Sequence, residues 1–313
     1  MCRNSLNVFW MPVRTLFFAA LAVCVAAPLL LTGNAARRAA QAVEQPPPGQ
    51  SRPAPVNGFV ELAGRRYDEA AYACTHNAMA SRDRRFLFPN QFSSLTQQLE
   101  DGIRAMMLDI HRDGNALALC HGRCIYGRQP LSEGLAEIRN FLDAHPHAVL
   151  TLLVEVSGGI PPEELASAFR AAGLAEYCHA QEPGKPWPLL QEMVAAGRRL
   201  VVLTDGGAGG IPWLHDMWQW MWDTPWKVRR KADFTCERGR GDPSNPLFNL
   251  NHFLSNPVPL PKLAEQANDA EFLYQRANAC RTKWKQIPNF VTVDFYEIGG
   301  VLEAVNRLNG VGG

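Results

Sequence analysis

The sequence has no excess of charge of either sign: 31 lysines and arginines face 30 aspartates and glutamates, which gives a formal net charge of +1. A chain with this balance has no electrostatic reason to bind nucleic acid. It also has no CxxC pair, so its eight cysteines do not suggest a zinc site. No internal repeat is visible. What is present, 313 residues of which 47% are hydrophobic, suits a globular protein with one large core.

The N-terminus has the pattern of a targeting segment. Arg3 and Arg14 precede an uncharged stretch, residues 15–36, whose apolar centre spans residues 16–31. Small residues at 33–35 offer a signal-peptidase site, and the stretch is also long enough to span a bilayer as an uncleaved anchor. We therefore expect residues 1–36 to be a signal peptide or a membrane anchor. The rest would be exported (periplasmic, secreted or membrane-anchored), where disulfides are permitted.

Residues 37–57 are rich in proline, with a Pro-Pro-Pro run at 46–48. This composition predicts an extended, semi-rigid linker, and a disordered tail without a role is the alternative. The folded part then covers residues 58–313. Its length fits one barrel-sized domain better than two small ones.

The folded part alternates between strand-like and helix-like segments. Several strand candidates are continuous apolar runs, as in strands buried on both faces, whereas the helix candidates are apolar on one face only. This alternation favours a single-domain α/β fold, a parallel TIM-like (β/α)8 barrel that is regular or irregular. Strands are expected at residues 71–74, 105–110, 116–119, 149–156, 200–204, 247–253 and 290–295, and helices around residues 131–142, 165–174, 190–194 and 301–308.

Polar side chains gather where the predicted strands end. In a barrel of parallel strands the C-terminal strand ends open onto one face, where the active site lies. A purely structural distribution would scatter such residues over helices and loops. The side chains concerned are His76 and Asn77 after the first strand, Asp109 at the end of the second, His121 after the third, Glu155 near the end of the fourth, Asp205 after the fifth and Asp294 near the end of the last.

Taken in order, these segments resemble the phosphatidylinositol-specific phospholipase C X-domain-like phosphodiesterases. The resemblance is strongest to the small secreted or anchored branch of plants, fungi and bacteria, and it covers nearly all of residues 71–309. The segments that carry it are Thr75-His76-Asn77, Gly102 to Asp109, Cys120-His121-Gly122-Arg123-Cys124, Leu150 to Glu155, Trp187 to Met193, Arg199 to Thr204 and Asn289 to Tyr296.

The resemblance implies an irregular TIM-like barrel and cleavage of a phosphodiester, which in the best-known members belongs to a phosphoinositide lipid. There an inositol hydroxyl attacks phosphorus, one histidine acts on the attacking side, and the other protonates the leaving oxygen. The two histidines of the family fall on His76 and His121. The calcium ligands, in members that use calcium, fall on Asn77, Asp109 and Glu155.

The residue types support the same chemistry by themselves. An imidazole has an ordinary pKa of about 6.5, so it can accept a proton or, once protonated, donate one. His76 and His121 therefore suit acid–base catalysis on a phosphate ester. Asp294 can hold a histidine in its productive tautomer. The amide and carboxylate oxygens of the implied metal set are hard ligands of the kind that calcium prefers.

The sequence leaves the use of calcium open. Calcium-dependent members carry Glu-x-Asp on the second strand, whereas Met107-Leu108-Asp109 occupies that register here. If the register is shifted by two, His111 stands where calcium-free bacterial members place an arginine. Either Ca²⁺ completes the site or no metal is used. His111 and Asp205, both at strand ends, are candidates for contact with the substrate, and a structural role is the alternative for each.

Six cysteines remain once the two in the leader are set aside, and an even count in an exported protein suggests up to three disulfides. Cys120 and Cys124 flank His121, so a bridge between them would fix the backbone of that histidine. The other candidate pairs are Cys236 with Cys280, both in late loops, and Cys74 with Cys178, which is only the remainder.

Tryptophans crowd into residues 213–226, after a glycine-rich stretch. One interpretation is an interfacial loop near the barrel mouth, and the basic residues at 227–231 would suit an anionic lipid surface. The other interpretation, which we favour, is a helix packed on the barrel.

The leading hypothesis for function is an exported phosphoric diester hydrolase that acts on a phospholipid or inositol-phosphate headgroup, with a membrane surface as its partner. The alternative is a non-catalytic module that binds a headgroup or an envelope partner on the same barrel. The missing carboxylate at Met107 supports this alternative, and the intact pair of histidines argues against it. A third hypothesis keeps the chemistry and changes the lipid to a glycerophosphodiester or a sphingolipid.

Overall fold

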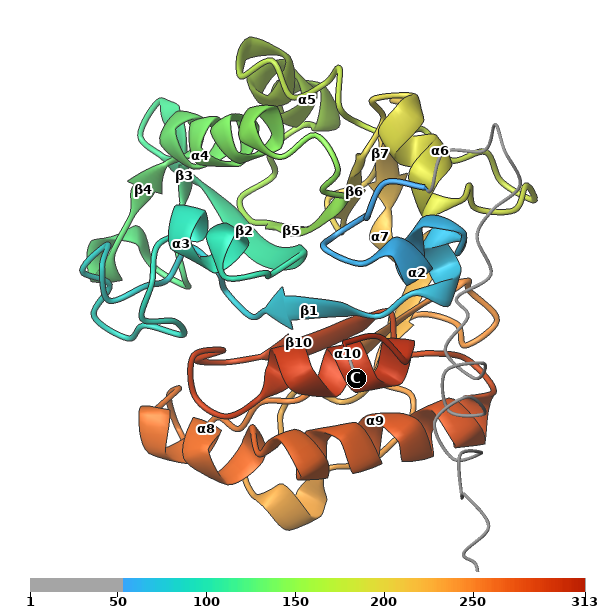
Figure 1. Cartoon of the computed structure of the whole chain (residues 1–313). Helices are drawn as coiled ribbons and strands as arrows, with labels where there is room; N and C mark the ends of the chain where they lie inside the picture. Colours follow the sequence, from blue (N-terminus) through green and yellow to red (C-terminus); the bar gives the residue numbers. More distant parts are fainter. Residues whose placement is uncertain (1–52, 313) are drawn as a thin grey trace, which may run out of the picture. The chain divides into compact units, whose positions relative to one another are not determined.

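A computed structural model describes residues 53–312 of the chain. The main path of its sheet has the strand order β7-β6-β5-β2-β1-β10-β9-β8 (Figure 1), and every neighbouring pair on this path is parallel. These strands are β1 Tyr72–Thr75, β2 Ala105–Asp113, β5 Leu150–Val156, β6 Leu200–Thr204, β7 Leu214–Asp216, β8 Met221–Asp223, β9 Leu247–Asn251 and β10 Phe290–Val293.

Helices connect the strands and cover the outside of the sheet. Figure 1 shows α9 and α10 on the side of β10, with α4 and α5 beyond β2 and β5. The helices are α2 Val60–Ala63, α3 Leu95–Glu100, α4 Leu131–Ala144, α5 Pro162–Ala171, α6 Leu190–Ala195, α7 Met217–Trp220, α8 Pro261–Ala267, α9 Ala270–Trp284 and α10 Val301–Asn309, with short 3-10 turns η1 Tyr67–Glu69, η2 Cys124–Tyr126 and η3 Lys231–Asp233.

The sheet curls into a barrel that stays open at one seam. β7 and β8 follow each other in the chain but stand at the two ends of the strand order, and among the described residues no ladder joins them. The predicted TIM-like α/β fold is confirmed, in its irregular form. The Trp-rich segment holds both strands of the seam, joined by the single turn of α7. The favoured helix interpretation of this segment is therefore wrong for most of its length.

One predicted strand lies outside the parallel barrel. β3 (Ala116–Leu119) runs antiparallel to the end of β2 and also pairs with the short β4 (Gln129–Pro130). The chain reverses at Gly114, whose φ of +63° is open to glycine at little cost. The Cys120 amide donates to the Asp109 carbonyl at 3.2 Å. His121 thus reaches the mouth because a hairpin brings it back, and not because a barrel strand ends there as expected.

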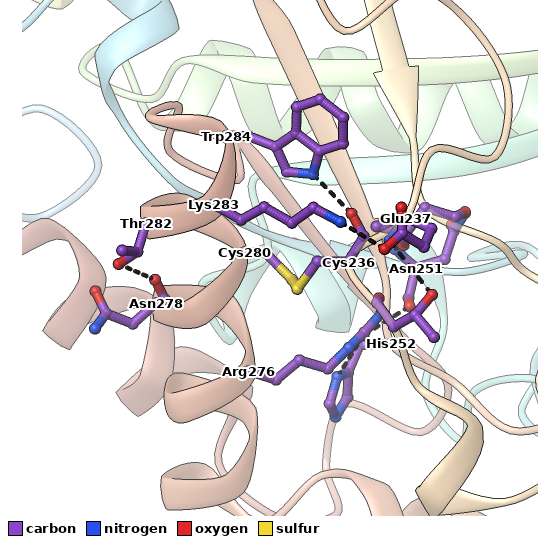
Figure 2. The surroundings of a disulfide bond; sticks show 12 residues. Cys236, Glu237, Asn251, His252, Arg276, Asn278, Cys280, Thr282, Lys283 and Trp284 are labelled. Atoms are coloured by element: carbon purple, nitrogen blue, oxygen red, sulfur yellow. Dashed lines mark hydrogen bonds and ion pairs between the residues drawn. A yellow bond between two sulfur atoms is a disulfide. The ribbon is translucent and has the colours of Figure 1, made fainter.

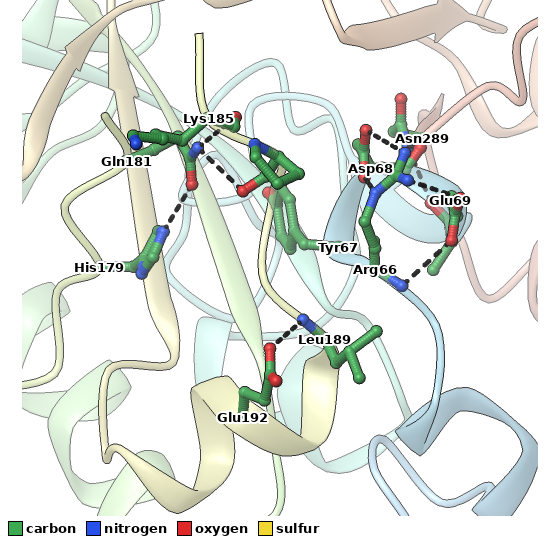
Figure 3. A network of polar contacts seen from close by, with 12 residues as sticks. Arg66, Tyr67, Asp68, Glu69, His179, Gln181, Lys185, Leu189, Glu192 and Asn289 are labelled. Atoms are coloured by element: carbon green, nitrogen blue, oxygen red, sulfur yellow. Dashed lines mark hydrogen bonds and ion pairs between the residues drawn. The ribbon is translucent and has the colours of Figure 1, made fainter. Parts of the chain in front are cut away.

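The opposite end of the barrel is held by polar contacts (Figure 3). Asn289, just before β10, donates its amide hydrogens to the carbonyls of Asp68 (2.9 Å) and Ala70 (3.0 Å), which precede β1. Its amide oxygen accepts a hydrogen bond from the Phe248 amide at 2.9 Å. One side chain therefore joins the starts of three parallel strands, which leaves their other ends free to carry function.

Within residues 53–312 two disulfides form, Cys120–Cys124 and Cys236–Cys280, which are two of the three pairs considered. Cys74 is buried in β1, and it and the buried Cys178 are free thiols. The third candidate pair is therefore not formed.

The last residues of the predicted linker contact the barrel. Val56 is buried, and Asn57 donates to the Val149 carbonyl and accepts from the Val149 amide, so both pack on the barrel. The predicted signal peptide or anchor at 1–36 and residues 37–52 of the predicted linker lie outside the described residues. No helix within residues 53–312 has the length and apolar character needed to cross a membrane.

Candidate active site

A cavity of about 590 Å³ opens at the C-terminal ends of the parallel strands. Six of the eight predicted site residues lie on its wall, and the other two, Asp294 and Asp205, do not. The six are His76, Asn77, Asp109, His111, His121 and Glu155.

His76 directly follows β1 and is fixed first by Asp294 and Phe253. Its Nδ1 lies 2.8 Å from Asp294 Oδ1, and its ring stacks on Phe253 with the ring centroids 3.8 Å apart. Burial lowers the pKa of His76, but the charge and hydrogen bond of Asp294 outweigh it, so the net pKa is raised. Nδ1 therefore carries the hydrogen that Asp294 accepts, and Nε2 is the nitrogen that can take up a proton.

Two asparagines complete this arrangement. Asn90 donates to Asp294 Oδ1 at 2.8 Å, the same oxygen that His76 Nδ1 contacts, which fixes the carboxylate beside the imidazole. Asn77 has φ +45°, a left-handed conformation that asparagine adopts more readily than most residues. Its amide nitrogen lies 3.2 Å from His76 Nε2. Among the described residues its amide oxygen has no hydrogen-bond donor.

Asp109 and Glu155 form an acidic pair on adjacent strands. They stand opposite each other in the register of β2 and β5. Burial, and then the Glu155 charge, raise the pKa of Asp109 to about 7. Its Oδ1 is buried and has no hydrogen-bond partner among the described residues. A buried carboxylate oxygen in this state needs a proton or a cation nearby.

His121 lies in the small loop closed by Cys120–Cys124. Burial lowers its pKa, and the charge of His76 lowers it further, whereas a hydrogen bond to the Phe88 carbonyl acts in the opposite direction. The two histidines thus share one cavity but have pKa values shifted in opposite directions. That is the arrangement expected of a proton acceptor and a proton donor that work on the same substrate.

The two predicted substrate contacts differ in position. His111 lines the cavity beyond the end of the parallel part of β2, and burial lowers its pKa. Asp205 does not line the cavity. Its Oδ1 accepts a hydrogen bond from the Val156 amide at 2.7 Å, so it ties the end of β6 to β5.

Sequence reasoning missed several residues of the site. Asn90 and Phe253 lie in loops without a motif, and their roles depend entirely on the position of His76. Asp223 closes β8, a strand hidden by the Trp-rich composition of its segment. Arg240 enters the cavity from the long connection between β8 and β9. The Gly239 and Gly241 that flank it are the local signal that marks a close approach of the backbone.

Calcium fits the chemistry of the donors in this cavity. The orphaned Oδ1 of Asp109, the Glu155 carboxylate and the free amide oxygen of Asn77 are hard oxygen ligands. Among residues 53–312 no three His, Cys, Asp or Glu side chains gather in a metal cluster. A bound Ca²⁺ would therefore depend on the amide oxygen, and on water or substrate oxygens, to complete its shell.

The family follows from a match along most of the sequence. A family model described as PI-PLC X 1 matches residues 62–309. The chain belongs to the PI-PLC X family. A PI-PLC X domain-containing protein 1 of Arthroderma benhamiae is 30% identical over 278 residues, which cover 82% of this chain and 89% of the relative. A PI-PLC X domain-containing protein of Arabidopsis thaliana is 28% identical over 298 residues, which cover 85% of this chain and 68% of the relative.

A third relative and the solved structures agree with this assignment to the PI-PLC X family. An uncharacterized secreted protein of Arthroderma benhamiae is 26% identical over 310 residues, 90% of this chain and 69% of the relative. The phosphatidylinositol-specific phospholipase C of Listeria monocytogenes superposes with a TM-score of 0.55 at 15% identity, covering 79% of this chain and 94% of that one. The Staphylococcus aureus enzyme (its F249X mutant) gives 0.54 at 12% identity, covering 80% and 95%. At these identities the structures establish the fold alone.

Proposed function

We propose that this PI-PLC X protein is an exported phosphodiesterase that cleaves a phospholipid or inositol-phosphate headgroup. The observation that carries the proposal is the pair His76 and His121 on one cavity, with pKa values shifted in opposite directions. A phosphodiester needs a base on the attacking oxygen and an acid on the leaving oxygen, and two such imidazoles provide both.

In this proposal His76 is the base. Asp294 stabilises the imidazolium that forms when Nε2 takes the proton of the attacking hydroxyl. That oxygen bonds to phosphorus while the bond to the lipid alkoxide breaks, and protonated His121 gives its proton to the departing oxygen. The lowered pKa of His121 makes its imidazolium the stronger acid of the two, although a smaller fraction of His121 is protonated near neutral pH, and the raised pKa of His76 makes its Nε2 the stronger base.

The proposal also includes a metal site at the acidic pair Asp109 and Glu155. Asn77, Asp109 and Glu155 would hold Ca²⁺, and a bound calcium would supply positive charge close to the phosphate. Without a metal, Asn77 and Glu155 order the wall of the cavity through their contacts with His76 Nε2 and Arg240 Nη1.

A lipid surface is the partner we propose for this face of the barrel. The large apolar side chains that stay exposed are concentrated in loops around the cavity. Basic residues lie next to them in sequence, such as Arg85, Arg123 and Lys227, and suit anionic headgroups. The two disulfides and the relative named as secreted support export. The exposed apolar residues of these loops are Leu87, Phe88, Ile125, Tyr126, Trp226 and Leu260.

The test is turnover of phosphatidylinositol vesicles by the wild type and by His76→Ala and His121→Ala, with and without EGTA. We expect each variant to lose about 10²-fold or more of kcat, because each removes one proton-transfer group, and to keep the wild-type Tm. A cyclic inositol phosphate product would identify the attacking oxygen. Exposed His147 provides the control, since His147→Ala should behave as wild type. Full activity in either active-site variant would refute the assignment.

A further inference from the structure

We propose that Arg240 is a built-in cation of the active site that donates hydrogen bonds to the non-bridging oxygens of the phosphodiester. The inference rests on the proposed phosphodiesterase function and adds a catalytic residue to it. Among the described residues that line the cavity, Arg240 is the one lysine or arginine. It stands on the connection between β8 and β9, residues 224–246, which we call the strap.

The strap is anchored firmly to α9. Figure 2 shows the disulfide Cys236–Cys280 together with the contacts on both sides of it. Trp284 Nε1 donates to the Cys236 carbonyl at 2.7 Å, and Arg276 Nη2 donates to the Thr235 carbonyl at 2.8 Å. Arg240 lies four residues after this anchor, so its backbone position is set by the barrel and does not depend on a free loop.

The backbone around Arg240 then pairs with the edge of β8 that has no neighbouring barrel strand in the described part of the chain. The Asp223 amide donates to the Arg240 carbonyl at 3.0 Å, and the Gly239 amide donates to the Asp223 carbonyl at 2.7 Å. A Cβ at Gly239 would lie 2.6 Å from Asp223 Oδ1, and one at Gly241 would lie 2.4 Å from the Met221 carbonyl oxygen. Only glycines permit this approach, which covers the edge of the open seam and aims Arg240 at the cavity.

The guanidinium is held in one orientation. Nε and Nη2 donate to Asp223 Oδ2 at 2.9 and 2.7 Å, and the group lies over the Trp218 ring at 4.5 Å. Nη1 reaches Glu155 Oε1 only at a long 3.4 Å. A guanidinium has five N–H groups in a fixed planar fork, so donors on both terminal nitrogens remain without a partner among the described residues. A donor fixed in this way costs little reorganisation when an anion arrives.

The charge of the cavity favours such a group. Asp109 and Glu155 lie on its wall, and together they repel an anionic phosphodiester. Asp223 is fully buried behind Arg240 and holds it, but a buried partner cannot approach the substrate. Arg240 is half-buried, with 36% of its side chain exposed, so it can contact a ligand in the cavity. It also bridges Asp223 and Glu155, and so separates two carboxylates on neighbouring parts of the wall.

The experiment compares Arg240→Ala with the neighbouring control Arg238→Ala on phosphatidylinositol vesicles. Arg238 is exposed and donates only to the Gly241 carbonyl. We expect Arg240→Ala to lose about 10²-fold of kcat/KM at an unchanged Tm, because a preorganised donor to the developing charge is removed. Millimolar guanidinium chloride should restore part of this activity but none of the activity of His121→Ala. Arg238→Ala should stay within twofold of wild type.

A double variant covers the case in which Arg240→Ala leaves Asp223 unpaired and unfolds. Asp223→Asn with Arg240→Gln removes both charges, and it should fold and show the same loss of activity. Binding of inorganic phosphate, followed by calorimetry, separates this inference from the proposed function: the wild type should bind and Arg240→Gln should not, even if no phosphodiester is turned over. Activity within threefold of wild type, or a loss that follows Tm and is not rescued by guanidinium, would overturn the assignment.

Discussion

At the scale of single residues, chemistry is set by what each side chain touches. His76 and His121 have the same side chain and line the same cavity. Asp294 raises the pKa of His76, whereas burial and the charge of His76 lower the pKa of His121. His252 and His215, in contrast, have a structural role and do not line the cavity. Both are buried in the barrel wall and hydrogen-bonded to backbone groups, which keeps them neutral.

These neutral histidines make the stability of the fold depend on pH. Burial lowers the pKa of His252 to about 3 and that of His215 to about 4. The unfolded chain binds protons at these sites from about pH 6.5 downward, and the folded chain does not, so stability falls as the pH falls through this window. For His252 alone the loss between pH 7 and pH 5 is about 2 kcal/mol.

Urea unfolding of the wild type and of His252→Gln at pH 7 and pH 5 measures this effect. We expect the variant to lose less stability between the two values than the wild type, because glutamine does not titrate. The exposed His147→Gln should follow the wild type. An identical loss in wild type and His252→Gln would contradict the assignment of a neutral buried imidazole.

At the scale of elements, the site depends on segments that are not barrel strands. The β2–β3 hairpin carries His121, and the strap carries Arg240. Each is closed by a disulfide next to its functional residue: Cys120–Cys124 around His121 and Cys236–Cys280 before Arg240. Residues in loops are not held by the packing that holds a strand in place. The two disulfides therefore help to hold His121 and Arg240 in position.

The two disulfides should differ in what their removal costs. They close loops with sequence separations of 4 and 44 residues. Loop entropy then predicts losses of about 2 kcal/mol for Cys120→Ser with Cys124→Ser and about 4 kcal/mol for Cys236→Ser with Cys280→Ser. Urea unfolding of both double variants checks the order. A larger loss for the short loop would show that it has a packing role beyond the crosslink.

At the scale of the whole molecule, the two ends of the barrel have different surfaces. The N-terminal strand ends are tied by Asn289 and the polar contacts around it, whereas the C-terminal ends carry the cavity and exposed apolar loops. Ile125 and Leu87 are the most exposed of these apolar residues, at 77% and 62%. An apolar rim around a cavity with basic neighbours suits a protein that works at a lipid surface.

Sedimentation with anionic phospholipid vesicles tests this surface. Leu87→Ser with Ile125→Ser should weaken vesicle binding about tenfold, since two apolar side chains no longer enter the interface. Turnover of a water-soluble inositol phosphodiester should stay within twofold, because neither residue lines the cavity. Val60→Ser serves as the control: Val60 is exposed to 42% but lies in α2, away from the rim. Unchanged vesicle binding of the double variant would rule out this face.

The sequence by itself determined the parallel α/β barrel and the residues at the ends of its strands. Continuous apolar runs specify buried strands, and the polar residue that follows such a run must lie at the mouth, which placed His76, Asp109 and Glu155 correctly. Each of these local patterns is compatible with only one kind of structure. The order and spacing of the segments also indicated the family, which the match over residues 62–309 establishes.

Only the tertiary structure decided how the third strand pairs, where the barrel opens, and which distant residues enter the site. β3 has the composition of a barrel strand, but its short turn after β2 leaves room only for an antiparallel partner. The partners Asn90, Asp223 and Arg240 lie in loops or in a short strand. The glycines beside Arg240 indicate a close approach of the backbone, but no local pattern indicates that these partners lie near His76 or Glu155. Contacts between residues far apart in the chain depend on how the whole barrel closes, and a local pattern does not carry that information.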